Sequence, residues 1–396
     1  MSGPDGSPGA ETTPAPDGSD NEAVRLSKLD VAIVGAGPAG AALAVNLAVA
    51  HGLDVLVLER EAAPRFRIGE TLPGAARPLL RDLGLLPGLC ARGYPRSLGR
   101  ASIWGSGELV RADSFSDPQG PGWCLDRRDF EAWIVAEAQR GDAAVVRSCQ
   151  LTAVRRTGNP SHPWSIAFVL PHGEAQTADA RFLVDATGRR AAIARRLGAT
   201  AIRIDRLVCC YALYPAGPPS DLDRFSIVEA APNGWFYGAC LPSGARLVAY
   251  HTDSDLALKG SWRREFADLV AGTVIARAFH IDEAPSPSPP LPARVAAWSG
   301  YSSACTGDGW AAVGDAACCF DPLSSQGLFN ALYGALQLAP AIAASLAGDR
   351  RAIGDYAKRL GSIWAAYRRH HNAYYWQERR WPNRAFWRRR HRPAND

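Results

Sequence analysis

The sequence predicts an α/β protein, in which a Rossmann-type dinucleotide-binding domain is interwoven with an antiparallel-sheet domain and followed by a helical C-terminal segment. Three observations predict this class. An apolar run at Leu29–Val34 leads into a glycine-rich turn and a helix of small residues. Strand-like runs separated by Pro and Gly fill residues 205–251. After about residue 349 the chain has helical character and then becomes basic and aromatic. Strands that alternate with helices indicate a parallel sheet, and successive strands indicate an antiparallel one.

The glycine-rich turn, Gly35-Ala-Gly-Pro-Ala-Gly40, lies between that first strand and a helix expected over residues 41–50. Gly35 permits the tight turn, Gly37 lets the backbone approach a pyrophosphate, and Gly40 allows the helix to pack closely on the strand. The helix N-terminus, which includes Ala39, offers free N–H groups and partial positive charge to phosphates. Because a strand precedes the turn and a helix follows it, the pattern favours a bound dinucleotide over a turn without a ligand.

A second strand, expected at residues 54–58, ends at the acidic residue Glu59, 19 positions after the last glycine. The Glu59 carboxylate can accept hydrogen bonds from ribose hydroxyls, and it disfavours a 2′-phosphate because like charges would meet. Arg60 beside it weakens this argument without reversing it. The β-α-β unit therefore suits either FAD or NAD.

The remaining elements follow from hydrophobic periodicity. Asp126–Gln139 has the spacing of a helix, and Pro285–Pro292, with five prolines in eight residues, is expected to be a stiff connector. Strands are expected at 143–146, 164–170, 181–184, 207–213, 225–229, 234–241, 245–250 and 310–313, and a long helix at 326–347. We expect a nucleotide-binding domain at 29–204 and 285–347 that includes some strands of the other domain, an antiparallel-sheet domain at 205–284, and a C-terminal helical, basic and aromatic segment at 348–396.

Composition narrows the class of protein further. The nine cysteines include no C-x-x-C pair and no zinc-like spacing with histidine, so we expect no metal site. Residues 1–28 lack the apolar stretch of a signal peptide and are expected to be a disordered leader. No run approaches the ~18 apolar residues of a membrane span. We therefore expect a reduced, cytoplasmic protein without a membrane anchor.

Two later stretches favour FAD. Arg181-Phe-Leu-Val-Asp-Ala-Thr-Gly-Arg189 is followed, further along, by Gly309-Trp-Ala-Ala-Val-Gly-Asp-Ala-Ala317 and Asp321-Pro-Leu-Ser-Ser-Gln-Gly327. Together with the glycine turn, and in the same order, they resemble the flavin motifs of the p-hydroxybenzoate hydroxylase superfamily, which includes the flavin-dependent halogenases. The resemblance covers most of residues 29–345, and it implies a Rossmann-type FAD-binding domain.

The resemblance also implies roles for individual residues. Asp315 ends a strand beneath the cofactor, where it can accept from a ribityl hydroxyl; its competing interpretation is a helix N-cap. The loop entering the last long helix offers N–H groups to the reduced ring. Arg127 stands where family members place an arginine near the cofactor, although a surface arginine is the alternative. The residues expected at FAD are Gly35, Gly37, Ala39, Gly40, Glu59, Arg60, Arg127, Asp185, Gly188, Gly314, Asp315, Pro322, Gly327 and Leu328, with Ser325 and Gln326 at the reacting ring.

The segment Arg67-Ile-Gly-Glu70-Thr-Leu-Pro73-Gly resembles the G-E-x-x-x-P segment of halogenase-like members, yet three departures argue against halogenation. Halogenases of this family need a lysine between flavin and substrate, and none occurs between Lys28 and Lys259; an arginine, with a pKa above ~12 and a planar head, is a poor substitute. Tryptophan halogenases carry a glutamate where this chain has Ser324. Their W-x-W-x-I-P signature is reduced here to Gly234-Trp-Phe-Tyr-Gly-Ala-Cys-Leu-Pro242.

The resemblance therefore implies an FAD-dependent monooxygenase that hydroxylates an electron-rich aromatic ring through a flavin C4a-hydroperoxide. The alternatives are a flavin-dependent halogenase and a non-oxygenase FAD reductase. Glu70 is the best-placed candidate acid or base, with a structural hydrogen bond as its competing interpretation. No second dinucleotide fingerprint is present, so electrons are expected from NAD(P)H that binds transiently or from a separate flavin reductase.

The C-terminal stretch Tyr374–Arg390 is dense in arginine and aromatic residues. It resembles the R-W-P…F-W tail of halogenase-like flavoproteins that mature cysteine tryptophylquinone. This resemblance implies that the substrate is a tryptophan within a partner polypeptide; a free indole or phenol is the alternative. Alternatively, a helix could bury Trp376, Trp381 and Phe386 on the antiparallel-sheet domain while its arginines face water. The arginines could dock an acidic partner, whereas nucleic-acid binding is the least favoured interpretation.

Overall fold

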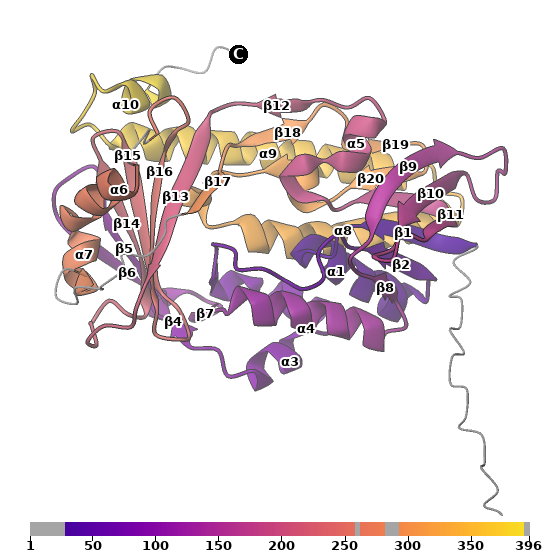
Figure 1. Cartoon of the computed structure of the whole chain (residues 1–396), viewed down its shortest axis with the longest axis horizontal. Helices are drawn as coiled ribbons and strands as arrows, with labels where there is room; N and C mark the ends of the chain where they lie inside the picture. The colour runs from indigo at the N-terminus through magenta and orange to yellow at the C-terminus, as the bar shows by residue number, and fades with distance from the viewer. Residues whose placement is uncertain (1–27, 258–261, 282–292, 392–396) are drawn as a thin grey trace, which may run out of the picture.

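The computed structural model describes residues 28–257, 262–281 and 293–391 (Figure 1). The expected leader, apart from Lys28, and the expected proline-rich connector lie outside these residues. Figure 1 shows a mixed sheet with its helices at one end and a seven-stranded sheet at the other, and α9 (Ala352–Gln377) extends along both. The predicted α/β class is confirmed.

The nucleotide-binding sheet is organised around β1 (Leu29–Val34). This strand pairs in parallel with β2 (Val55–Leu58) and with β11 (Ala175–Asp185). The order is β19-β20-β11-β1-β2-β8, where β8 is Ala144–Val146, β19 Thr306–Gly307 and β20 Trp310–Ala312. β11 continues into an antiparallel ribbon with β10 (Trp164–Val169) and β9 (Gln150–Arg156). The strand expected at 181–184 is therefore only the buried end of a longer one.

Three helices pack together on this sheet: α1 (Pro38–Val45), α4 (Arg127–Arg140) and α8 (Gly327–Leu346). α1 begins earlier than predicted because Pro38 suits the first helical turn, and it continues as a π-helical turn at Asn46–Ala50. Among the described residues, α8 is the one helix long and apolar enough to cross a membrane by length and composition. It nevertheless packs within the protein core, where Leu332, Leu338 and Ile342 are fully buried.

The seven-stranded sheet has the order β17-β13-β16-β15-β14-β5-β6. Its centre is the expected antiparallel run of β13 (Leu207–Tyr214), β16 (Arg246–Asp253), β15 (Gly234–Cys240) and β14 (Phe225–Ala231). β17 (Ala293–Ala296) forms one edge. β5 (Gly99–Ile103) and β6 (Val110–Asp113) come from the part of the chain before residue 204, and β5 pairs with β14 in parallel.

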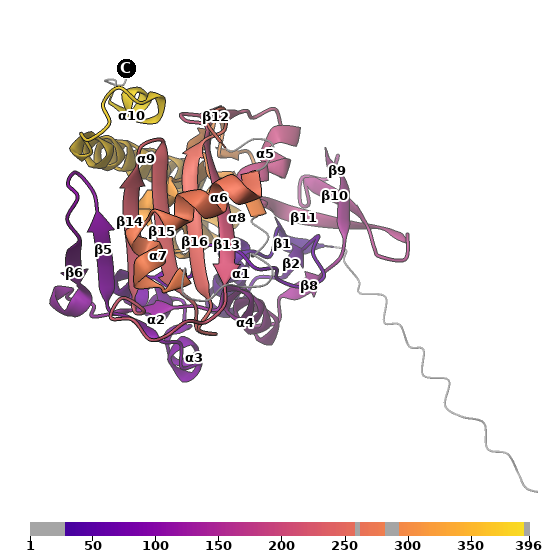
Figure 2. The same cartoon turned by 60° about the vertical axis from the view of Figure 1, so that its left-hand side comes forward.

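Helices α6 (Trp262–Ala271) and α7 (Val274–Ala278) cover the outer face of this sheet (Figure 2). Phe266, Ile275 and Phe279 belong to the core between these helices and the strands. The opposite face looks toward the nucleotide-binding sheet (Figure 1). The remaining elements are the sheets β3-β7-β4 (Thr71–Leu72, Gly122–Cys124, Arg96–Ser97) and β12-β18-β21 (Ala201–Arg203, Gly300–Ser302, Cys318–Cys319), and the helices α2 (Arg77–Asp82), α3 (Leu86–Ala91) and α5 (Ala192–Arg196).

The C-terminal segment ends in α10 (Ala385–Arg390), beside one end of the seven-stranded sheet (yellow in Figure 1). Phe386, Trp387 and Tyr375 are fully buried in one apolar cluster with Leu207 and Trp235 of the sheet. These aromatic side chains therefore pack on the sheet, whereas Trp376, which could have been buried with them, is 50% exposed.

Candidate active site

A cavity of about 1440 Å³ lies between the glycine turn and the inner face of strands β13, β15 and β16. Pockets for drug-sized ligands have volumes of roughly 300–1,000 Å³. The larger volume here has room for a dinucleotide cofactor together with a second molecule.

The glycine turn forms the nucleotide end of the cavity. Gly35 has a φ of +110°, and a Cβ there would stand 2.3 Å from the carbonyl oxygen of Ala186. Gly40 lies behind the wall, since a Cβ on it would stand 1.9 Å from the Gly35 oxygen. Gly37 is different, because a Cβ there would meet only Arg67 Nη1, at 4.0 Å. The protein thus fills the space around Gly35 and Gly40 but leaves Gly37 open toward the cavity.

Glu59, which directly follows β2, lines the cavity together with four other residues expected at FAD: Gly35, Gly37, Ala39 and Arg60. Its carboxylate accepts hydrogen bonds from the backbone N–H groups of Ala36 at 2.7 Å and Glu61 at 2.9 Å. The carboxylate is therefore held in place by the glycine turn itself. Its remaining lone pairs are available for ribose hydroxyls.

Asp315 lies in a short turn directly after β20 and also lines the cavity. Arg189 Nη1 donates to its carboxylate at 2.6 Å. The same guanidinium donates to the carbonyl oxygens of Trp298 and Phe320, at 3.3 and 3.1 Å. Burial opposes the charge on Arg189, but Asp315 and neighbouring carboxylates raise its pKa. Arg189 thus fixes Asp315, a function that the sequence did not suggest because the two residues are brought together only by the fold.

Asp185, which was expected at FAD, does not line the cavity. Its fully buried carboxylate accepts from the N–H and hydroxyl of Thr187, at 2.9 and 2.7 Å, and from the N–H groups of Ile193 and Ala194, both at 2.8 Å. Four protein donors occupy its lone pairs, so Asp185 holds the turn from β11 into α5. Gly188 does line the cavity, whereas Gly314 does not; a Cβ at Gly314 would stand 2.8 Å from the Cβ of Ala39, too close for the present packing.

The loop Asp321–Gly327 leads into α8. Asp321 caps the turn by accepting from the N–H of Leu323 at 2.9 Å. Ser325 adopts the left-handed conformation, with φ 52°, and α8 begins two residues later. Four of the residues expected at FAD or its ring line the cavity, namely Pro322, Ser325, Gly327 and Leu328, whereas Gln326 is exposed and does not. Because the start of a helix carries free N–H groups, this loop can stabilise negative charge.

Arg127 is the first residue of α4 and lines the cavity. It is ion-paired with Glu131 and donates to the carbonyl oxygens of Ile68 at 3.1 Å and Gly69 at 2.9 Å. Within the described residues its buried Nε has no hydrogen-bond partner. Arg127 therefore holds the segment before Glu70 and keeps one donor for a polar group of a bound cofactor.

Glu70 is buried but does not line the cavity. Its carboxylate accepts from the Tyr237 hydroxyl and, at 2.9 Å, from the N–H of Gly69. Burial and the neighbouring carboxylate raise the pKa of Tyr237 well above its usual value, so its hydroxyl stays protonated. Since Tyr237 itself lines the cavity, the structure gives Glu70 the alternative role of a hydrogen-bond acceptor behind the wall.

The opposite wall of the cavity is made by two rows of side chains on the seven-stranded sheet. Strand register places Cys209, His251 and Trp235 side by side on β13, β16 and β15. The His251 and Trp235 rings stack, with centroids 3.7 Å apart and an angle of 6°. The neighbouring row contributes Tyr211 and Tyr237. We call these five residues the aromatic wall.

His251 is a member of this wall that the sequence did not suggest. Burial lowers its pKa to about 3, so the imidazole is neutral near neutral pH. Its Nδ1 is buried without a hydrogen-bond partner among the described residues. Alternation along β16 would place His251 on one face with Asp253, but only the strand register shows that this face meets Trp235 and the cavity.

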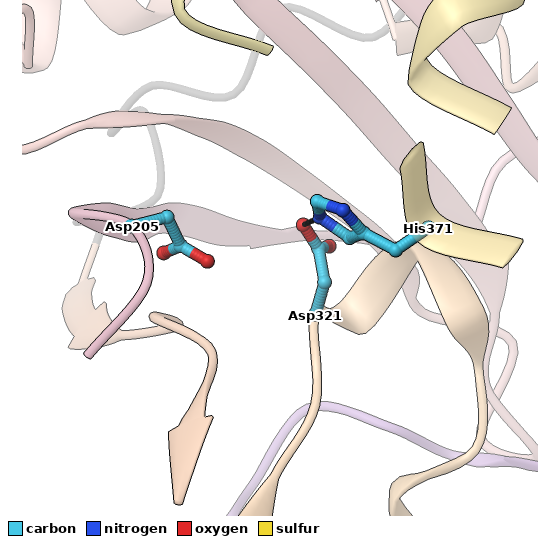
Figure 3. A group of neighbouring side chains, drawn as sticks. All are labelled: Asp205, Asp321 and His371. Atoms are coloured by element: carbon cyan, nitrogen blue, oxygen red, sulfur yellow. Dashed lines mark ion pairs between the residues drawn. The ribbon is translucent and has the colours of Figure 1, made fainter. Parts of the chain in front are cut away.

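Asp205, Asp321 and His371 form a cluster whose donor atoms lie within 4.8 Å of one another; Asp321 is buried and the other two are half-buried (Figure 3). Figure 3 shows His371 reaching from α9 toward Asp321, with Nε2 3.3 Å from the carboxylate. These residue types can bind metals. Here, however, the N–H of Leu323 and the hydroxyl of Tyr375 already bind the Asp321 oxygens, so we describe the cluster as a hydrogen-bonded network.

Tyr375 connects this network to the aromatic wall. Its hydroxyl donates to Asp321 at 2.8 Å and accepts from Trp235 Nε1 at 2.9 Å. One fully buried side chain of the C-terminal segment thus contacts both the loop that enters α8 and the wall opposite it.

Comparisons with known proteins agree with this geometry. The chain matches the model of the FAD binding domain family over residues 28–359. LodB of Marinomonas mediterranea, named as an FAD-dependent oxidoreductase, is 30% identical over 377 residues, which cover 92% of this chain and 98% of LodB. The myxobacterial chondrochloren halogenase CndH has a TM-score of 0.83 at 25% identity, over 93% of this chain and 87% of CndH. The peptidyl tryptophan dihydroxylase QhpG has a TM-score of 0.72 at 25% identity, over 92% of this chain and 78% of QhpG.

The open position at Gly37, the unpartnered Arg127 Nε and the N-terminus of α8 are all features that fit FAD. Fold and site together define a flavin-dependent oxidoreductase. The chain belongs to the FAD binding domain family, and the predicted resemblance to the p-hydroxybenzoate hydroxylase and halogenase superfamily is confirmed.

Proposed function

We propose that this enzyme hydroxylates an electron-rich aromatic ring, and that the ring is a tryptophan within a partner polypeptide. The observation that carries the proposal is the aromatic wall opposite the start of α8, in a cavity with no lysine among its described lining residues. A flat, electron-rich ring stacks well against aromatic side chains. A relay of hypohalite needs a lysine amine, which this wall does not supply.

The positions of the three lysines support this argument. Lys28 directly precedes β1 and is exposed, and Lys358 is exposed on α9 and paired with Asp355 at 2.9 Å. Lys259 lies outside the described residues. The cations that line the cavity are arginines, among them Arg67, Arg127 and Arg189, and arginine is a poor carrier because it does not lose its proton.

Residues of the chain have distinct tasks in the proposed reaction. When bound and reduced, FAD supplies two electrons to O₂, so that one oxygen atom enters the ring and the other leaves as water. The glycine turn, Glu59 and Asp315 hold the cofactor, and the start of α8 stabilises negative charge at its ring. Trp235 and Tyr237 orient the substrate ring and exclude water. The stacked, neutral His251 adds no charge to this wall.

The relatives support polypeptide tryptophan as the substrate. QhpG is a peptidyl tryptophan dihydroxylase, and its similarity covers 92% of this chain. A free indole or phenol is the alternative substrate. The electron donor is proposed to be NAD(P)H or a separate flavin reductase.

A second candidate function, flavin-dependent halogenation, is favoured by the similarity to CndH. The two activities differ in whether the product contains halogen. Purified protein with reduced FAD, O₂ and a tryptophan-containing peptide should add one or two oxygen atoms to the peptide, measured by mass spectrometry, with or without chloride or bromide. A chlorinated or brominated product would overturn the hydroxylase proposal. Product that forms without O₂ consumption would instead support a reductase.

A further inference from the structure

The positive charge of the chain is concentrated at its C-terminal end. Residues 356–396 contain eleven Lys and Arg but only two Asp and Glu, a formal charge of +9, whereas residues 1–355 sum to −4. Since like charges crowded into a short segment repel one another, this distribution needs a counter-charge.

Part of that counter-charge comes from the protein itself. Arg380 pairs with Glu378 at 2.6 Å, and Arg389 and Arg390 pair with Asp253 at 2.7 and 2.9 Å. Arg389 also pairs with Asp255, at 2.6 Å. Arg389 and Arg390 thus join α10 to the seven-stranded sheet, whereas the Arg380–Glu378 pair lies within the segment itself.

A second group of arginines in the same segment has no such partner. Arg369, Arg379, Arg384 and Arg388 are exposed, and within the described part of the chain none of them forms an ion pair. Trp376 belongs to the same segment and is 50% exposed. The Arg379 guanidinium stands 3.6 Å from the centre of its ring, and His391, at the end of α10, packs on its edge. We call Trp376 and these four arginines the arginine patch.

The arginine patch rests on a rigid base close to the active site. Tyr375, next to Trp376 in the chain, is fully buried and forms hydrogen bonds with Trp235 of the aromatic wall and with Asp321, at the start of the loop that enters α8. Phe386 and Trp387, beside Arg388, are also fully buried. The exposed charges are therefore presented on an ordered surface, one residue away from a side chain that contacts the cavity wall.

We propose that the arginine patch docks an acidic segment of the polypeptide whose tryptophan enters the cavity, an inference that rests on the proposed function. Arginine and tryptophan are the residue types that dominate binding energy at protein interfaces, and complementary charge accelerates association and fixes orientation. A polypeptide is favoured over a nucleic acid or an anionic membrane because the patch is joined through Tyr375 to a cavity suited to an aromatic side chain. The other two partners are outcomes of the test.

The test uses the FAD-loaded full chain and a fluorescein-labelled synthetic peptide in which glutamates flank a single tryptophan. Fluorescence anisotropy should give a Kd at least about ten-fold lower than for the same peptide with glutamines, a difference of ~1.4 kcal/mol. The triple variant R379E/R384E/R388E should weaken binding about ten-fold or more. W376A, which changes no charge, should weaken it by a smaller factor.

The matched control is R81E/R155E/R350E, which makes the same change in net charge at three exposed arginines outside the patch and without ion pairs among the described residues. It should bind the acidic peptide within about two-fold of the parent protein, ~0.4 kcal/mol. Equal weakening by both triple variants would overturn the proposal, since net charge alone would then explain binding. Tighter patch-dependent binding of a poly-dT oligonucleotide or of phosphatidylserine vesicles than of the peptide would also overturn it.

This binding measurement needs no turnover, so the two proposals fail separately. Patch-dependent binding without any oxygenated product would contradict the hydroxylase proposal and leave a docking surface. Oxygenation of the acidic peptide with a KM that R379E/R384E/R388E leaves unchanged would contradict the docking proposal alone.

Discussion

The two walls of the cavity are built in opposite ways. The nucleotide wall takes backbone groups from one short stretch, Gly35–Ala39, and from the starts of helices, and its acidic side chains, Glu59 and Asp315, follow the ends of strands. The aromatic wall consists of side chains from three strands, and Tyr375 of α9 supports it from behind. A backbone wall requires small residues at fixed spacing, whereas a side-chain wall requires that distant segments meet in a particular register. The first kind of wall can therefore be predicted from a short local motif in the sequence, whereas the second cannot.

The largest effects are expected from valine substitutions at Gly35 and Gly37, which should differ in outcome: the first should prevent folding and the second should weaken FAD binding. Gly35→Val should abolish folding, because its φ of +110° disfavours any side chain and a Cβ would stand 2.3 Å from the Ala186 oxygen. Gly37→Val should fold, since the protein leaves that position open, but lower FAD affinity by about 100-fold or more, ~2.7 kcal/mol. Soluble yield, circular dichroism and flavin-fluorescence titration measure these outcomes.

Gly354→Val serves as the control for valine at a glycine, since a Cβ there meets no atom within 4 Å and the position lies in α9, away from the cavity lining. It should retain FAD binding. If Gly37→Val bound FAD as tightly as the parent protein, the glycine turn would not be the pyrophosphate site.

The same contrast explains what the sequence could predict. Local motifs, each with its own physical reason, were enough to indicate four residues as candidates for the FAD site: Gly35, Glu59, Asp315 and Gly327. All four line the cavity. Asp185 belongs to such a motif too, but the motif does not reveal that its carboxylate is used up by four donors within its own turn.

Arg189, His251 and Tyr375 were missed for a different reason. Each acts across a long separation in the chain, on Asp315, Trp235 and Asp321 respectively. Likewise, the pairing of β5 with β14 in parallel joins segments whose local periodicity says nothing about their partner.

The next largest effect concerns the support of the aromatic wall. Trp387→Ala should lower the free energy of unfolding by ~3–5 kcal/mol, because it empties a fully buried site beside Tyr375 and Trp235. Trp376→Ala, at a half-exposed tryptophan of the same segment, should change it by less than ~0.5 kcal/mol. Urea denaturation measures both, and equal losses would mean that the tail does not support the wall through its buried side.

A smaller effect is expected where Glu70 meets the wall. Tyr237→Phe removes the hydroxyl that Glu70 accepts and leaves a buried carboxylate oxygen without that donor, which should cost ~1–3 kcal/mol of stability. Combined with Glu70→Gln, the loss should be less than additive, because the two groups share one interaction. Strict additivity in urea denaturation would contradict the assignment of Glu70 as the group that orients Tyr237.

The smallest effect tests the neutral imidazole in the aromatic wall. The pKa of His251 is about 3 in the folded protein and ~6.5 when unfolded. Below pH 6.5 the unfolded chain therefore binds a proton that the folded chain does not, so stability is complete above that pH and falls as the pH drops toward 3. Between pH 6.5 and 5 the expected loss is about 1.5 kcal/mol.

His251→Phe keeps a ring against Trp235 but removes the proton site, so its stability should change less over that pH interval. Asp321 does not confound the comparison, because its pKa is lowered from an ordinary value near 3.8 and its contribution is lost only at lower pH. His370→Gln, at an exposed histidine of α9, should keep the parent slope. If His251→Phe kept the parent's pH dependence, the imidazole would not be the buried neutral group of the aromatic wall, and this wall would have to accommodate a charged imidazolium at low pH.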